Sequence, residues 1–296
     1  MKKTIFEGSG VAIVTPYTAT GVDYEMLGKL IEFQIAGGTD ALIICGTTGE
    51  ASTMPDEEHL EVIGYAVEKV AGRIPVIAGT GSNDTHHGIQ LSKQAQQRGA
   101  DALLLVTPYY NKASQKGLYE HFASTAKSVD IPVVLYNVPS RTGVTIALDT
   151  YRKLADIDNI VAVKEASGNL AYAMKIRAAC GDKLDLYSGN DDVIVPMLSI
   201  GGKGVISVLA NILPRETHDI CERFFQGDVQ GSLALQLKYM KLIEALFSEV
   251  NPIPVKAALK YMGYDCGKYR LPLCEMEEQH AELLKKAMLD AGMTLA

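Results

Sequence analysis

The chain has 296 residues, of which 47% are hydrophobic and 21% are charged, and its formal net charge is -7. This length and apolar content suit one large α/β domain, alone or with a small appendage, and allow a full hydrophobic core. The acidic balance, with no basic cluster, argues against nucleic acids and anionic membranes as partners.

Short apolar runs recur through the chain and predict eight β-strands, which begin near residues 10, 41, 75, 102, 132, 160, 184 and 203. Several intervening segments show the helical spacing of apolar residues, namely 23–36, 55–70, 86–98 and 114–128. Strands that alternate with helices of this length predict βαβ units and parallel pairing. Eight such units favour an α/β fold of the (β/α)8 TIM barrel type over a doubly wound sheet.

The strand signals end after Gly227, and the rest of the chain predicts three helices, at residues 232–250, 254–262 and 275–291. We therefore expect a barrel with the active site over residues 1–227. A small C-terminal helical domain should follow over residues 228–296.

Lys164 closes the apolar run Ile160–Val163 and is followed at once by polar residues. Burial there would lower the pKa of the amine, which is what a Schiff-base nucleophile needs near neutral pH. Taken alone, the same pattern also fits a strand-end lysine that reaches into water.

Other polar residues also follow the predicted strands. They therefore lie at the C-terminal ends of the strands, which is the end of such a barrel that supplies the reacting groups. These loops are Thr47–Glu50, Tyr109–Asn111, Tyr136–Arg141 and Lys164–Glu165. Because successive side chains in a strand alternate between faces, an inward Lys164 predicts inward Ala162 and Ile160 and outward Val161 and Val163. The same rule directs Tyr136, Val134 and Pro132 to one side. The two strands are consecutive, so we expect the Tyr136 hydroxyl within reach of the Lys164 amine.

Four motifs together resemble the dihydrodipicolinate synthase branch of the pyruvate-dependent class I aldolase superfamily, which also contains N-acetylneuraminate lyase. They are GTTGE at 46–50, TPYYN at 107–111, YNVPSRTG at 136–143 and KEASGN at 164–169. The resemblance covers essentially the whole chain. It implies Schiff-base condensation of pyruvate with L-aspartate 4-semialdehyde, in the diaminopimelate route to L-lysine, with no metal or organic cofactor.

The resemblance also implies a role for each matching residue. Lys164 would form the imine with pyruvate, and three hydroxyls would relay protons, those of Tyr136, Thr47 and Tyr110. Substrate contacts would come from Thr48 on the pyruvate carboxylate, Arg141 on the semialdehyde carboxylate, and Gly189 and Ile206 along the cavity. In the family the tyrosine equivalent to Tyr110 crosses a subunit interface, so a homo-oligomer is expected, in the usual form a homotetramer built as a dimer of dimers.

A second set of positions matches the site at which lysine inhibits many family members, namely Ser52, His59, Asn83, His87 and Tyr109. His87 stands where those members have a glutamate that grips the amino groups of lysine. A charge-assisted pair of this kind is worth ~1.5–3 kcal/mol. We therefore expect weak or absent inhibition by L-lysine.

Four alternatives stay open at this stage. The chain could be another 2-oxo acid lyase such as N-acetylneuraminate lyase, although Arg141 would be wasted on a neutral sugar tail. It could be a metal-dependent hydrolase, although its histidines fall mainly on helical segments and no H-x-H ends a strand. A non-catalytic binding barrel and an imine on Lys203 also remain, but Lys203 precedes its strand and should lie at the opposite face.

The predicted location is the cytoplasm. Five cysteines without a C-x-x-C pair are typical of reduced thiols in a cytosolic enzyme. The first residues run into Glu7 and Gly8 before any apolar region long enough for a secretory signal. No apolar run approaches the ~18 residues of a membrane span.

Overall fold

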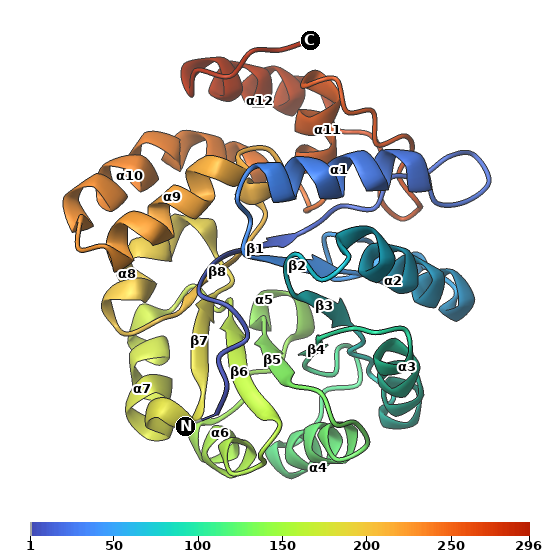
Figure 1. The fold of residues 1–296 in the computed structure, drawn as a ribbon, viewed down its shortest axis with the longest axis vertical. Helices are drawn as coiled ribbons and strands as arrows, with labels where there is room; N and C mark the ends of the chain where they lie inside the picture. Colours follow the sequence, from blue (N-terminus) through green and yellow to red (C-terminus); the bar gives the residue numbers. More distant parts are fainter. Residues whose placement is uncertain (1) are drawn as a thin grey trace.

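The computed structural model describes residues 2–296 and confirms the (β/α)8 TIM barrel (Figure 1). Eight parallel strands close the barrel in chain order: β1 Gly8–Ala12, β2 Ala41–Ile44, β3 Val76–Gly79, β4 Ala102–Val106, β5 Val133–Asn137, β6 Ile160–Glu165, β7 Asp185–Ser188 and β8 Gly204–Ser207. Around them run α1 Tyr24–Ala36, α2 Asp56–Val70, α3 Thr85–Gln97, α4 Gln115–Ala126, α6 Leu148–Ala155, α7 Leu170–Cys180, α8 Ile194–Ser199 and α9 Pro214–Phe225.

Several helices begin where a short polar side chain caps their free N–H groups. Asp23 accepts a hydrogen bond from the backbone N–H of Met26 at the start of α1, and Ser114 accepts one from Gly117 at the start of α4. Asp84 caps α3 through the N–H groups of His86 and His87. Such caps satisfy donors that the first helical turn leaves unpaired, and the predicted starts lie within two residues of the observed ones.

The interior of the barrel confirms part of the predicted alternation and corrects the rest. Val134 and Tyr136 pack inside the barrel, as expected, whereas Pro132 precedes β5. On β6 the prediction is wrong at two residues, because Val161 packs inside and Ile160 packs against the surrounding helices.

A β-bulge explains this correction. Val133 pairs with Ile160 but Val134 pairs with Ala162, so the register shifts and Val161 has no partner of its own. An extra residue in one strand reverses the alternation on its N-terminal side. Beyond the bulge, Ala162 faces inward and Val163 outward as predicted, and Lys164 is opposite Tyr136.

Three helices follow α9, as the sequence predicts: α10 Val229–Leu246, α11 Ile253–Tyr261 and α12 Glu278–Asp290. In Figure 1, α10 lies alongside α9, and α11 and α12 lie together beyond α1. The domain boundary at residues 227 and 228 stays a prediction. Within residues 2–296, none of the helices combines the length and apolar character that crossing a membrane requires.

The chain that follows α11 returns to the barrel. The Tyr17 N–H donates to the Cys266 carbonyl oxygen over 3.0 Å, and Tyr17 forms a parallel bridge with Gly267. Gly267 has φ +68°, and a Cβ there would lie 1.8 Å from the Tyr17 oxygen. Only glycine permits this close approach, which ties residues 266–270 to the loop after β1.

We predict that Gly204→Ala lowers the free energy of unfolding by about 2–4 kcal/mol. Gly204 has φ +150°, and a Cβ there would lie 1.9 Å from the Gly8 carbonyl oxygen, where β8 meets β1. Chemical denaturation should be compared with Gly227→Ala, which has φ +88° and no atom within 4 Å of the added Cβ. That control should lose only about 1 kcal/mol for its backbone. Equal losses would contradict the steric argument.

Candidate active site

Lys164 and Tyr136 form the centre of the site. They are paired across the neighbouring strands β6 and β5, and the Lys164 Nζ lies 4.4 Å from the centroid of the Tyr136 ring. Lys164 is only 6% exposed. The structure therefore places the amine against the inner wall of the barrel and not in water.

Burial lowers the pKa of the Lys164 amine to about 8. The negative charge of Asp191 raises this pKa and the positive charge of Arg141 lowers it, but both effects are smaller than desolvation. Removing an ammonium from water disfavours its charged form. At pH 7 roughly a tenth of the molecules then carry a neutral amine with a free lone pair.

Tyr136 stays a neutral phenol at physiological pH. Burial raises its pKa, while the charge of Arg141 and a side-chain hydrogen bond with Thr47 act in the opposite direction. A neutral hydroxyl can both donate and accept a hydrogen bond. Tyr136 thus brings a neutral phenol beside the amine, and Thr47 borders the same cavity as Tyr136.

The loop Gly46–Glu50 after β2 has a tight, fixed conformation. The N–H of Glu50 donates to the Thr47 carbonyl oxygen over 3.0 Å, and the Thr15 hydroxyl donates to the Gly49 carbonyl oxygen over 2.8 Å. Glu50 itself has a positive φ of 57°, which is unusual for a residue with a Cβ. Tertiary contacts must hold such a conformation in place.

Asn251 joins two predicted site residues. Its side-chain amide donates to the Thr48 hydroxyl over 2.9 Å, and its carbonyl oxygen accepts from the Arg141 Nη2 over 3.2 Å. Arg141 belongs to the short helix α5, Pro139–Thr142. Sequence reasoning missed Asn251, because nothing in the link between α10 and α11 indicates contact with a loop so distant in the chain.

Asp191 is the second residue that the sequence did not single out. Its Oδ2 accepts hydrogen bonds from the N–H groups of Val208 and Leu209, at 3.0 and 2.9 Å, while its Oδ1 is buried and has no hydrogen-bond partner within residues 2–296. Burial raises the pKa of this carboxyl. The only sequence feature that could have indicated Asp191 was the presence of an acidic residue shortly after the seventh predicted strand.

One cavity of about 340 Å³ brings both predicted sets of residues together. Its lining includes Thr47, Tyr136 and Arg141, and also four positions of the second set, Ser52, His59, His87 and Tyr109. Asn83 lies beside it and donates to the Tyr109 carbonyl oxygen over 3.2 Å. Members of both groups thus border one cavity.

Two of the histidines have defined partners. The His87 Nε2 lies 2.9 Å from an oxygen of Asp56, and its Nδ1 lies 3.0 Å from the Ser82 hydroxyl. The His59 Nε2 is 2.8 Å from the Gly79 carbonyl oxygen, and burial lowers its pKa. Asp56 is the one carboxylate that lines the cavity within the described chain, and His87 already engages it.

Lys164 is not among the residues that line this cavity, although Tyr136 beside it is. The remaining predicted residues do not line it either. Thr48 faces Asn251, and Ile206 packs in the barrel interior. Gly189 donates its N–H to the Glu165 oxygen, and a Cβ there would lie 2.5 Å from that of Ala166. Tyr110 is 91% exposed and has a positive φ of 71°.

Residues 5–291 match the model of the Dihydrodipicolinate synthetase family. The chain is 59% identical to the 4-hydroxy-tetrahydrodipicolinate synthase of Acetivibrio thermocellus, over 99% of the chain and 100% of that protein. It is 60% identical to that of Lachnoclostridium phytofermentans, over 98% and 99%. The solved dihydrodipicolinate synthase from Aquifex aeolicus superposes with a TM-score of 0.96 at 44% identity, covering 98% and 99% of the two chains.

We predict that Lys164→Met stabilises the folded protein at pH 7. The pKa of Lys164 is about 8 in the fold and 10.5 in the unfolded chain, so between these values the unfolded chain binds more protons and stability rises with pH. Burial of the ammonium is therefore unfavourable below pH 8, and removing it should add up to about 3 kcal/mol. Urea unfolding at pH 7 and pH 10 should show a gain that shrinks at the higher pH. A variant less stable than wild type at pH 7 would contradict this.

Proposed function

Because the chain belongs to the dihydrodipicolinate synthetase family, we propose that it condenses pyruvate with L-aspartate 4-semialdehyde through an imine on Lys164. This is the activity of a 4-hydroxy-tetrahydrodipicolinate synthase, a Schiff-base-forming lyase of the diaminopimelate route to L-lysine. The observation that carries the proposal is the buried Lys164 amine, with its pKa lowered to about 8, beside the Tyr136 ring.

The chemistry begins with attack of the neutral amine on the ketone carbon of pyruvate. The resulting carbinolamine loses water and becomes a protonated imine, which acts as the electron sink. The methyl group of pyruvate then loses a proton, and the enamine carbon adds to the aldehyde of the second substrate. Attack of the substrate amine on the imine carbon closes the ring and releases Lys164, so no resident cofactor enters the scheme.

Tyr136 and Thr47 are proposed to move the protons that these steps require. Tyr136 lies beside the amine, and Thr47 lines the same cavity as Tyr136. A positioned hydroxyl can donate to the departing oxygen of the carbinolamine and accept a proton in a later step. Tyr110 would complete this relay in a neighbouring subunit.

An exposed, strained tyrosine supports this role for Tyr110. A large aromatic side chain that is 91% exposed, on a residue with positive φ, is a costly feature for an isolated subunit. The adjacent Asn111 holds the loop by donating to the Asn83 carbonyl oxygen over 2.9 Å. We propose a homotetramer built as a dimer of dimers, located in the cytoplasm.

The substrate carboxylates have two proposed binding groups. Arg141 lines the cavity and presents a planar guanidinium, which can hold the semialdehyde carboxylate through two parallel hydrogen bonds. Thr48 and nearby backbone N–H groups would hold pyruvate, while Gly189 and Ile206 would shape the site. The Arg141 guanidinium at the border of the cavity is the feature that favours an acidic acceptor over the sugar of N-acetylneuraminate lyase.

Borohydride reduction in the presence of pyruvate tests the proposed function. We predict a stable adduct on the peptide that contains Lys164, and none in Lys164→Ala. The initial trapping rate should rise with pH and level off above about pH 8, because only the neutral amine attacks. Lys203→Ala serves as a control that should still trap pyruvate. An adduct on another lysine, or no adduct in the wild type, would refute the assignment.

Weak or absent inhibition by L-lysine is a further part of this proposal. The cavity offers one carboxylate, Asp56, and His87 engages it at 2.9 Å. A lysine amino group would have to displace His87 to gain a charge-assisted partner.

We predict that sub-millimolar L-lysine leaves most of the activity intact in a steady-state assay. His87→Glu should increase lysine affinity by roughly tenfold to a hundredfold, the equivalent of ~1.5–3 kcal/mol for a regained charge pair. The paired variant Asp56→His/His87→Glu controls for repulsion between adjacent carboxylates. Strong inhibition of the wild type at these concentrations would defeat the prediction.

A further inference from the structure

A buried ion pair joins the Gly46–Glu50 loop to the C-terminal helices. The Lys256 Nζ, on α11, lies 2.8 Å from the Glu50 Oε1, and the two side chains are only 1% and 0% exposed. The same Nζ donates to the Lys268 carbonyl oxygen over 3.0 Å. It also lies 4.9 Å from the ring centroids of Tyr17 and Tyr269.

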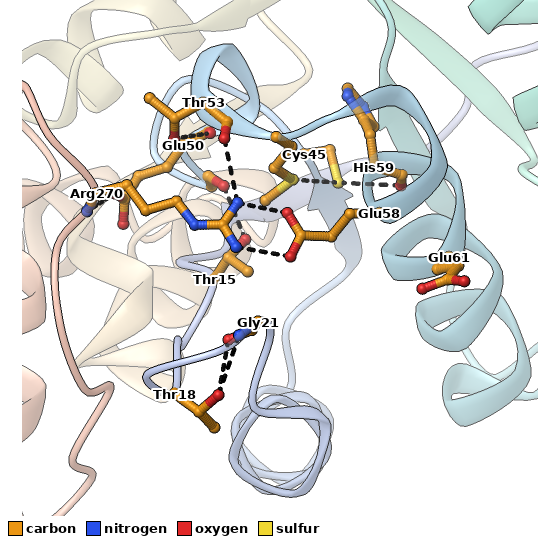
Figure 2. Close-up of polar contacts among 12 residues, drawn as sticks. Thr15, Thr18, Gly21, Cys45, Glu50, Thr53, Glu58, His59, Glu61 and Arg270 are labelled. Atoms are coloured by element: carbon orange, nitrogen blue, oxygen red, sulfur yellow. Dashed lines mark hydrogen bonds and ion pairs between the residues drawn. The ribbon is translucent and has the colours of Figure 1, made fainter.

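A second cation extends this connection. The Arg270 guanidinium makes a two-pronged ion pair with Glu58 and donates to the Thr53 carbonyl oxygen, as Figure 2 shows. Its Cζ lies 4.0 Å from the Tyr17 ring centroid, and its backbone N–H donates to the Glu50 Oε2 over 3.3 Å. Residues 266–270 thus contact the loops after both β1 and β2.

Stability alone gives no reason to bury this pair. Desolvating a carboxylate and an ammonium offsets most of their attraction, and apolar pairs of similar volume often stabilise a fold equally well. What the pair does supply is a fixed distance and direction between two segments that are far apart in the chain. Glu50 needs such a restraint, because its φ of 57° is an unfavourable conformation.

The restraint on Glu50 also acts on Thr47, which lies in the same turn. The Glu50 N–H donates to the Thr47 carbonyl oxygen, so the position of Glu50 fixes the turn that carries the Thr47 hydroxyl. Thr48 has a separate restraint in the hydrogen bond from Asn251. A shift of Glu50 would therefore move Thr47 more than Thr48.

We propose that Glu50 and Lys256 are positioning residues, through which the C-terminal helices hold the Thr47 hydroxyl in line with Tyr136 and Lys164. This inference rests on the proposed function, because it concerns the same imine-forming site. It assigns the C-terminal helices a part in the chemistry of the barrel. Neither residue touches the substrate.

The main variant is Glu50→Gln/Lys256→Met, which removes both charges and so leaves no lone buried charge. We expect it to fold, as circular dichroism and thermal unfolding can establish. Its rate of imine formation with pyruvate should fall by tenfold to a hundredfold, since misplacing a reacting group by about 1 Å can cost 10²-fold. The KM for pyruvate should change by less than about threefold, because Asn251 still holds Thr48.

A double-mutant cycle with Thr47→Val distinguishes positioning from general damage. If the pair acts through Thr47, removing it in the Thr47→Val background should slow imine formation by less than about threefold. Additive losses in the two backgrounds would overturn the proposal. Glu7→Gln/Lys203→Met is the matched control, because it removes an ion pair of 2.5 Å at the opposite end of the barrel and should leave the rate within about twofold.

Glu50→Gln/Lys256→Gln is the second variant, in case the first variant does not fold. It likewise leaves no lone buried charge, and its two amides can still hydrogen-bond, so it should show a smaller loss in the same step. A folded Glu50→Gln/Lys256→Gln with an unchanged rate and an unchanged response to Thr47→Val would overturn the proposal. If the wild type forms no adduct on Lys164, the proposed function fails; if it forms one and both pair variants match its rate, only this inference fails.

Discussion

The desolvation of one amine at the end of β6 is the constraint on which the site depends. Lys164 faces the Tyr136 ring, and no carboxylate within residues 2–296 makes an ion pair with it. A carboxylate in contact would hold the ammonium and remove the lone pair, whereas the barrel interior lowers the pKa to about 8. The charge of Asp191 keeps this effect moderate, so the amine stays basic enough to form a protonated imine.

Most of the fold could be predicted from local patterns. Most strands are short apolar runs, and the helices between them show helical spacing of apolar residues, so their order alone indicates a parallel barrel. The bulge at Val161 could not be predicted in this way. Residues 160–163 are all apolar, because a barrel strand is covered on both sides, and such a run gives no contrast from which to infer direction.

The candidate site also contains residues that could be predicted from the sequence and residues that could not. The loops that carry Thr47, Tyr136 and Arg141 could be placed together because each follows a strand, and these residues do line one cavity. Asn251 and Lys256 could not be placed, because they meet Thr48 and Glu50 across 203 and 206 residues of sequence. Contacts of that kind depend on how the C-terminal helices pack on the barrel, and no local periodicity encodes them.

The undivided cavity has a consequence for the design of small molecules. Arg141, Ser52 and His87 all border the same cavity, whose volume is about 340 Å³. A compound anchored at one end could therefore be extended by a linker to the other and gain the additive affinity of two joined fragments. His87 and its partner Asp56, 2.9 Å apart, would give such a bifunctional inhibitor a polar pair to contact in addition to Arg141.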